Sequence, residues 1–147
     1  MKKILLIIAM GITLFANAQI KEKKKAQYEN FYYPYNNKNS YPQIDKVIEP
    51  DSSIRYIFIY IDQRWASLED IKILTLGSDT SMIIQLFQIF SNCKENKELT
   101  YYDDKLDLHY NEGSLSVWEE EGNYFRITNK MCLDIIKTFR NKKEIKK

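Results

Sequence analysis

The segment 80–92 constrains the fold of this chain more than any other. Apolar side chains cover most of its helical surface and leave a polar stripe of only two glutamines and one serine. Such a helix is stable only when other elements bury it. The residues Gly77-Ser78-Asp79 interrupt regular secondary structure just before this segment. A side-chain oxygen of Asp79 or Ser78 is expected to cap the helix. We therefore expect a sheet that packs directly against this helix.

Strand patterns lie on both sides of the helix. The segment 54–61 is dense in Ile, Tyr and Phe, which is typical of a central strand covered on both faces. The segment 70–76 predicts a second strand, with Ile71 and Ile73 on one side and Lys72 on the other. After the helix, alternation and turn residues predict a short strand at Tyr101-Tyr102 and an antiparallel meander, with strands over 105–110, 115–119 and 124–128.

A last helix is predicted after Asn129, which caps it. Its apolar stripe consists of Cys132, Ile135, Ile136 and Phe139. The element order is strand, strand, helix, three or four strands, helix, or ββα-βββ(β)-α. This order predicts an α+β two-layer domain, in which a mostly antiparallel sheet of five to six strands carries both helices on one face.

The turn residues predict a register for the meander. A turn centred on Glu112-Gly113 places four pairs of residues opposite one another: Tyr110 with Leu115, His109 with Ser116, Leu108 with Val117, and Asp107 with Trp118. A two-residue turn at Gly122-Asn123 places Glu119 opposite Arg126, where the two side chains form a cross-strand ion pair. Both registers give favourable neighbours, which supports the assignment of these strands.

The first eighteen residues have the pattern of a secretory signal. Lys2 and Lys3 precede an apolar run over 4–15, and Ala16-Asn17-Ala18 offers a signal-peptidase site. The run is shorter than the roughly 20 residues that cross a bilayer as a helix. No cysteine stands near the expected mature start, Gln19, to carry a lipid. We therefore expect an exported protein, periplasmic or secreted, that is soluble, is not a lipoprotein and makes no stable membrane insertion after cleavage.

Three further segments complete the predicted organisation. Residues 19–53 combine a lysine run with tyrosines, asparagines and prolines without a sustained period, and they predict an extended or flexible arm. Residues 54–141 form the single α+β domain, and residues 142–147 form a basic tail. The charges of the chain balance once the signal is removed, because both excess lysines lie within it. A balanced chain has no general attraction to phosphates, so no nucleic-acid partner is expected.

The charges are nevertheless unevenly placed. The segment 98–121 holds eight acidic side chains against Lys105 alone, whereas the chain from Lys137 onward holds six basic side chains against Glu144. Either segment is explained by a solvated surface. The alternative is a polarised surface for an oppositely charged partner.

The predicted hairpin brings Asp107, His109 and Ser116 to one face, and these are the residue types of a hydrolytic triad. They are the candidate catalytic residues of the chain. However, Ser116 lies in mid-strand, without a glycine-rich turn or helix start that would supply oxyanion donors, and no glycine-serine-glycine elbow occurs. We therefore expect a chain that is not an enzyme, and a small hydrolase that uses His109 is the less favoured alternative.

Neither a metal nor a cofactor is expected. One histidine and two cysteines match no zinc spacing, and no phosphate-binding glycine motif occurs. The two cysteines, Cys93 and Cys132, are instead expected to form a disulfide, because export places them in an oxidising compartment. The alternative is a pair of buried free thiols that act as small hydrophobes.

Aromatic residues supply the candidate binding residues. Trp65 lies in the connection between the first two predicted strands, where core anchoring and partner contact both remain open. Trp118 shares the face of His109, so that face is either partly covered or a working surface. In the arm, the candidates are Tyr32, Tyr33 and Tyr35, because tyrosine offers an apolar face with a hydroxyl at little entropic cost.

One stretch resembles a recurring small exported module. It comprises the run from Ile73 to Ser81, which reads Ile-Leu-Thr-Leu-Gly-Ser-Asp-Thr-Ser, and then Ile84, Phe87, Phe90, Tyr101-Tyr102 and the meander. This stretch, about fifty residues, resembles the beta-lactamase-inhibitory-protein-like domains and the small lipoproteins of outer-membrane assembly. In those modules a leucine-glycine turn opens a helix packed on a short antiparallel sheet. The resemblance implies non-catalytic protein binding through the sheet face and loops.

Export, small size and surface aromatics together favour a small protein-binding module of inhibitor, immunity or adaptor type. Its expected partner is another exported or envelope protein. An envelope-associated structural or glycan-binding protein, with the tyrosine-rich arm as its binding segment, is the alternative.

Overall fold

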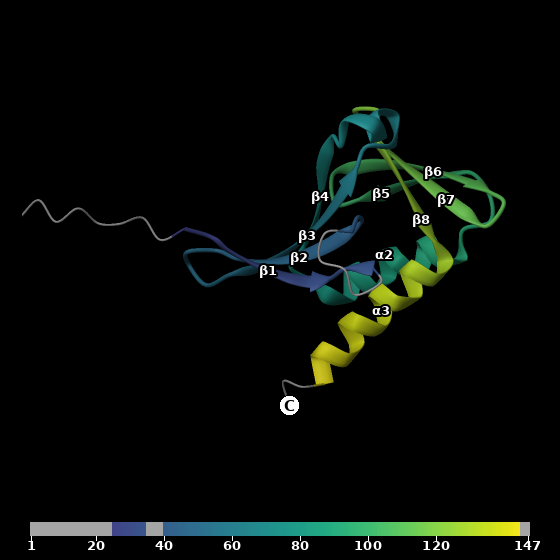
Figure 1. The fold of residues 1–147 in the computed structure, drawn as a ribbon. Helices are drawn as coiled ribbons and strands as arrows, with labels where there is room; N and C mark the ends of the chain where they lie inside the picture. The colour runs from purple at the N-terminus through teal and green to yellow at the C-terminus, as the bar shows by residue number, and fades with distance from the viewer. Residues whose placement is uncertain (1–24, 35–39, 145–147) are drawn as a thin grey trace, which may run out of the picture.

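The computed structural model describes residues 25–34 and 40–144, which form two antiparallel sheets and two α-helices (Figure 1). The first half contains β1 (Gln27–Tyr32), β2 (Gln43–Ile48), β3 (Ile54–Ile61), the 3-10 helix η2 (Gln63–Leu68), β4 (Ile71–Gly77) and α2 (Thr80–Asn92). The second half contains β5 (Lys97–Tyr101), β6 (Asp104–Asn111), β7 (Ser114–Glu119), β8 (Tyr124–Thr128) and α3 (Asn129–Glu144). Within the described ranges, no helix is long and apolar enough to span a membrane.

The α+β class is confirmed, but the prediction of one sheet with five to six strands is wrong. Sheet A has the order β1-β2-β3-β4 and sheet B has the order β5-β6-β7-β8, and all neighbours are antiparallel. The chain therefore runs through four strands and a helix twice, instead of ββα-βββ(β)-α. β4 and β5, which flank α2 in the sequence, do not pair within the described ranges. Their ends are joined by the Tyr101 hydroxyl, which donates to the Leu76 carbonyl at 2.7 Å.

Part of the segment 19–53, predicted to be an extended or flexible arm, belongs to sheet A. β1 pairs with β2, and β2 pairs with β3. The folded unit therefore begins well before the predicted boundary at residue 54. These strands were not predicted because neither shows an alternation of apolar and polar residues. β2 is covered on both faces and β1 is mostly exposed. The predicted signal over 1–18 lies outside the described residues, and α3 extends into the predicted basic tail as far as Glu144.

One hydrophobic core joins both sheets and both helices. In Figure 1, α2 and α3 lie side by side across the lower part of the molecule, beneath the strands. The Phe58 ring of β3 lies 4.7 Å from the ring of Phe125 in β8 and 5.9 Å from that of Phe87 in α2. The helix α2 has its predicted cap, since the Asp79 carboxylate accepts from two backbone amides of the first turn. The two sheets thus share one interior.

The expected disulfide between Cys93 and Cys132 is absent from the structure, and both residues are buried free thiols. Cys93 ends α2, where its Sγ donates to the Glu95 carbonyl at 3.1 Å. Cys132 lies in the first turn of α3, and burial raises the pKa of its thiol to about 12. Both side chains belong to the shared core, where they pack as small apolar groups.

The predicted register of the β6–β7 hairpin is confirmed in all four pairs, including His109 with Ser116 and Asp107 with Trp118. The predicted β7–β8 register is wrong, because Arg126 lies opposite Ser116 and not opposite Glu119. The turn is longer than two residues: the Glu119 amide donates to the Asn123 carbonyl at 2.8 Å. This longer turn frees the Glu119 side chain for a contact with sheet A.

Candidate functional site

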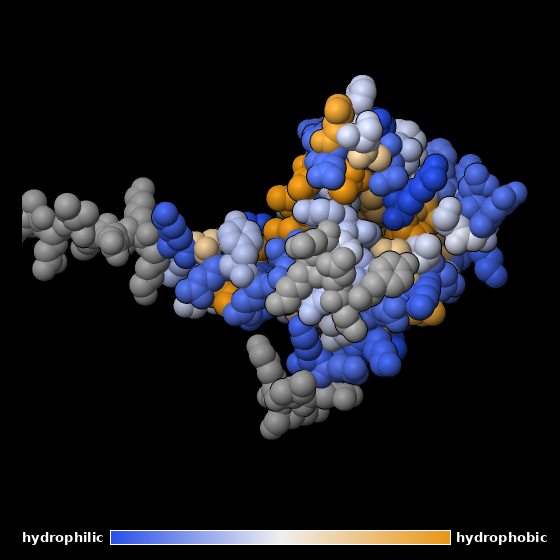
Figure 2. Space-filling model, viewed as in Figure 1, coloured by the Kyte–Doolittle hydropathy of each residue, from blue (hydrophilic) through white to orange (hydrophobic). Residues whose placement is uncertain are grey.

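Four large apolar side chains are exposed on the consecutive elements η2 and β4. The exposed fractions are 51% for Trp65, 73% for Leu68, 49% for Ile71 and 57% for Ile73. In Figure 2, hydrophobic side chains gather over β4 and the segment above it. We call these four residues the β4 patch. Trp65, one of the candidate binding residues of the sequence, therefore faces solvent and does not anchor the core.

The alternation of β4 exposes the two isoleucines of the patch. Leu74 and Leu76 are buried in the core, so Ile71 and Ile73 point to the opposite face of sheet A. The sequence separated the isoleucines from Lys72 correctly, but it did not identify them, or Leu68, as surface residues. Leu74 and Leu76, on the same side of the strand as Lys72, could have indicated that Ile71 and Ile73 are exposed. A strand that is apolar on both faces has one exposed face when the core covers only the other.

β4 is also an edge strand of sheet A. Across β3, Ile59 lies opposite Ile73 and Ile61 lies opposite Ile71, and both β3 isoleucines are only partly buried. The apolar surface therefore continues from β4 onto β3. On its other side, β4 pairs with no strand in the described part of the chain. Unpaired backbone beside exposed apolar side chains is the usual template for the addition of a further strand.

A buried polar bridge fixes η2 onto sheet B. Asp62, which is wholly buried, caps η2 and accepts from the Arg64 backbone amide and guanidinium, with Nη2 to Oδ2 at 2.7 Å. The same Arg64 Nη2 donates to the Asn123 Oδ1 at 2.6 Å, and the Tyr124 amide donates to the Asp62 carboxylate at 3.4 Å. Burial alone would raise the pKa of Asp62, but these donors together hold it below its usual value. The bridge sets the position of the segment that carries Trp65.

A second contact joins the two sheets beside this bridge. The Tyr60 hydroxyl of β3 donates to the Glu119 carboxylate of β7 at 2.5 Å. Burial raises the pKa of Glu119, the Tyr60 hydrogen bond partly opposes this rise, and the nearby carboxylates of Asp104, Glu121 and Asp62 add to it. Folding therefore favours the protonated form of Glu119.

Replacing Glu119 with glutamine is expected to raise the free energy of unfolding at neutral pH. A carboxyl whose pKa is higher in the folded state stabilises the fold at low pH, and this contribution is lost as the pH rises from 4.5 through the folded pKa. Glutamine stays neutral and keeps an oxygen for the Tyr60 hydroxyl. Urea unfolding at about pH 3.5 and about pH 7.5 should show a gain only at the higher pH. Glu95→Gln, at an exposed position between α2 and β5, is the control, and a gain in Glu119→Gln that does not depend on pH would contradict the assignment.

The outer face of sheet B carries several of the candidate residues that were predicted from the sequence. Asp107, His109, Ser116 and Trp118 line one hollow of about 740 Å³ on this face. Within the described residues, no side-chain hydrogen bond links Asp107, His109 and Ser116, although His109 and Ser116 are paired in the β6–β7 ladder. Trp118 is half-buried and stacks on Tyr124, with ring centroids 4.1 Å apart and planes 16° apart. The hollow therefore presents carboxylate, imidazole and aromatic groups together.

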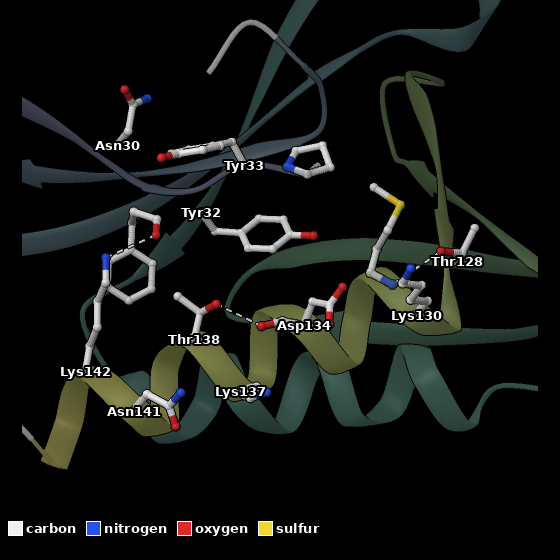
Figure 3. Close-up of a pocket in the computed structure, with 13 residues that line it drawn as sticks. Asn30, Tyr32, Tyr33, Thr128, Lys130, Asp134, Lys137, Thr138, Asn141 and Lys142 are labelled. Carbon is white, nitrogen blue, oxygen red and sulfur yellow. Dashed lines mark hydrogen bonds between the residues drawn. The ribbon is translucent and has the colours of Figure 1, made fainter. Parts of the chain in front are cut away.

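A third surface is the groove between β1 and α3 (Figure 3). Its volume is about 570 Å³, and Tyr32 and Tyr33 line it, as do three lysines and Asp134 of α3. Tyr32 is buried and Tyr33 is half-buried, whereas Tyr35 lies outside the described residues. The ammonium of Lys142 lies 4.0 Å from the centroid of the Phe31 ring and donates to the Phe31 carbonyl at 3.1 Å. Burial lowers the pKa of Lys142, and the nearby Lys46 lowers it further.

No protein-family model, curated protein or solved structure matches this chain. Its function is therefore inferred from its own surfaces. Among the three surfaces described above, the β4 patch has the largest exposed apolar side chains, and it combines them with a free sheet edge.

Proposed function

We propose that this chain is a small exported module that binds another protein without catalysis, and that the partner contacts the β4 patch. The observation that carries the proposal is the group of four exposed apolar side chains on and beside β4, an edge strand that pairs with no further strand among the described residues. Exposed apolar surface of this kind is typical of protein–protein contact sites, and tryptophan is frequent among residues that dominate binding energy. Because the first eighteen residues have the pattern of an export signal, the proposed partner is itself an exported or envelope protein.

The free edge of β4 gives the partner a backbone to pair with. In strand addition, main-chain hydrogen bonds supply affinity and alternate side chains supply specificity. Proteins usually protect a free edge with charged side chains, proline or a bulge. β4 has one lysine, Lys72, whose Nζ pairs with the Asp70 carboxylate at 3.1 Å. The bulge in the β3–β4 ladder lies at the Gly77 end, away from Ile71 and Ile73.

The proposal is tested by crosslinking followed by a binding measurement. A photo-reactive phenylalanine analogue at position 65 should capture a partner in the producing cell, whereas the same analogue at Leu133 of α3 should not. The captured protein is then purified and titrated with the full chain. Ile73→Lys is expected to weaken binding by about tenfold or more, because it places a charge in the centre of an apolar contact.

Leu133→Lys is the matched control, since Leu133 is exposed to 55% and lies on α3. Its affinity for the partner should equal that of the unmodified chain. Equal losses in both variants, or capture from position 133 and not from position 65, would refute the β4 patch as the binding surface.

A further inference from the structure

On the outer face of sheet B, one side chain from each of the four strands forms a row across the sheet. Two of these side chains are acidic and two are aromatic. The register places Glu98 of β5 opposite Asp107 of β6, Asp107 opposite Trp118 of β7, and Trp118 opposite Tyr124 of β8. Two carboxylates thus stand directly opposite each other, next to two stacked aromatic rings. Like charges at directly opposed positions destabilise a sheet. Both side chains are exposed, and a cation bound between them would remove their repulsion.

No ion pair within the described ranges compensates these two carboxylates. The salt bridges of those ranges lie elsewhere, on Glu29, Glu49, Asp62 and Asp70. The hollow over the row is lined by the carboxylates of Glu98, Asp107 and Glu120, against Lys105 as its one lysine. Glu119 also borders it, but the Glu119 carboxylate accepts from the Tyr60 hydroxyl of sheet A. Its potential is therefore negative, and a cation is the complementary ligand.

The aromatic side of the row narrows the kind of cation. The indole of Trp118 lines the hollow, and the His109 ring lies 6.3 Å away, at an angle of 73°. A tryptophan face attracts organic cations that carry an apolar stem or a delocalised charge. A metal ion is not the expected cation, because no group of three metal-ligating side chains lies together in the described part of the chain. The hollow thus combines acidic groups and an aromatic ring at directly neighbouring positions.

We propose that this hollow binds an organic cation, an alkylammonium or guanidinium group, which the carboxylates of Glu98 and Asp107 neutralise and the Trp118 indole contacts. The site is separate from the β4 patch and does not depend on the function proposed for it. The cation comes either from a lysine or arginine side chain of a protein partner or from a free small molecule. In both cases the recognition is the same, since only the charged group and its stem enter the hollow.

The test uses the fluorescence of Trp118 in the full chain with Trp65→Phe, which leaves Trp118 as the single tryptophan. The probes are N-acetyl-argininamide as the free cation, a tetra-arginine peptide as the protein-like source, and N-acetyl-glutaminamide as the neutral analogue. We expect saturable binding of a cationic probe and none of the neutral probe. Saturation by the small amide identifies a small-molecule cation, whereas saturation by the peptide alone identifies a partner side chain.

Two variants locate the site. Asp107→Asn keeps the shape of the side chain and is expected to weaken cation binding by about fivefold in the fluorescence titration. Trp118→Leu removes the fluorescent reporter, so its binding is measured by isothermal titration calorimetry, where a loss of about tenfold is expected. Asp134→Asn changes the net charge equally on the distant helix α3 and should change affinity by less than about twofold. The proposal is overturned if no cationic probe saturates, if the neutral probe binds as well, or if Asp107→Asn and Asp134→Asn have equal effects. Because Asp107 is exposed, its variant retains the fold and keeps the test decisive.

Discussion

Replacing Phe125 with alanine is expected to lower the free energy of unfolding by about 4 kcal/mol. Phe125 is buried, and its ring lies 4.7 Å from that of Phe58, 4.8 Å from that of Tyr60 and 6.4 Å from that of Phe90. It therefore connects β8 of sheet B to β3 of sheet A and to α2. A cavity bordered by two other elements, β3 and α2, collapses poorly, which places the loss near the upper end for such substitutions. Domains of this size are stable by about 5–15 kcal/mol, so this loss removes a large share of the total.

Urea denaturation followed by circular dichroism measures this loss. Phe125→Leu should lose less than half as much, because leucine fills most of the space. Tyr28→Ala is the control, since Tyr28 is an exposed aromatic residue of β1, and it should change stability by less than about 0.5 kcal/mol. If Phe125→Ala were no more harmful than Tyr28→Ala, the two sheets would not share one core.

Elements with strong local signals were predicted correctly from the sequence. The helix α2 has its predicted cap and bounds, because its apolar periodicity and its capping residue act within a few residues of each other. The β6–β7 hairpin has its predicted register because Glu112 and Gly113, both with positive φ, form the tight turn that sets it. Local chemistry is sufficient in both cases.

Elements set by distant contacts were missed. β2 forms a strand because it pairs with β3, and β1 forms one because it pairs with β2, whereas the residues of the two strands show no sustained period of their own. The division into two sheets depends on where α2 places β5 relative to β4, which no local pattern encodes. The β7–β8 register was wrong for a related reason, because contacts of Glu119 with sheet A and of Asn123 with η2 accompany a longer turn.

The candidate sites show the same division. The sequence singled out Trp65 and Trp118 by residue type, and the structure places the first on an exposed patch and the second in a hollow. It missed Ile71 and Ile73, because alternation separates the two faces of a strand without telling which one the core covers. Leu74 and Leu76 pack in the shared core, so their side of β4 is buried and the side of Ile71 and Ile73 is exposed.

Replacing Asp62 with alanine is expected to lower the free energy of unfolding by about 3 kcal/mol. The substitution removes the cap of η2, leaves the Tyr124 amide without its acceptor and leaves the Arg64 guanidinium without its carboxylate. It also removes the fixed geometry of η2 against the β7–β8 turn. Trp65 should therefore become more mobile, and binding through the β4 patch should weaken together with stability. Asp62→Asn keeps an acceptor and should lose less.

The pH dependence separates this effect from a simple packing loss. Because the pKa of Asp62 is lowered by folding, its contribution is fully present above its ordinary value of 3.8 and is lost as the pH falls through the folded pKa. The difference between the unmodified chain and Asp62→Ala should thus narrow in acid. Asp70→Ala, which breaks the exposed pair with Lys72, is the control and should cost less than about 1 kcal/mol. A difference that stays constant from neutral pH to acid would show that Asp62 acts through its shape and not through its charge.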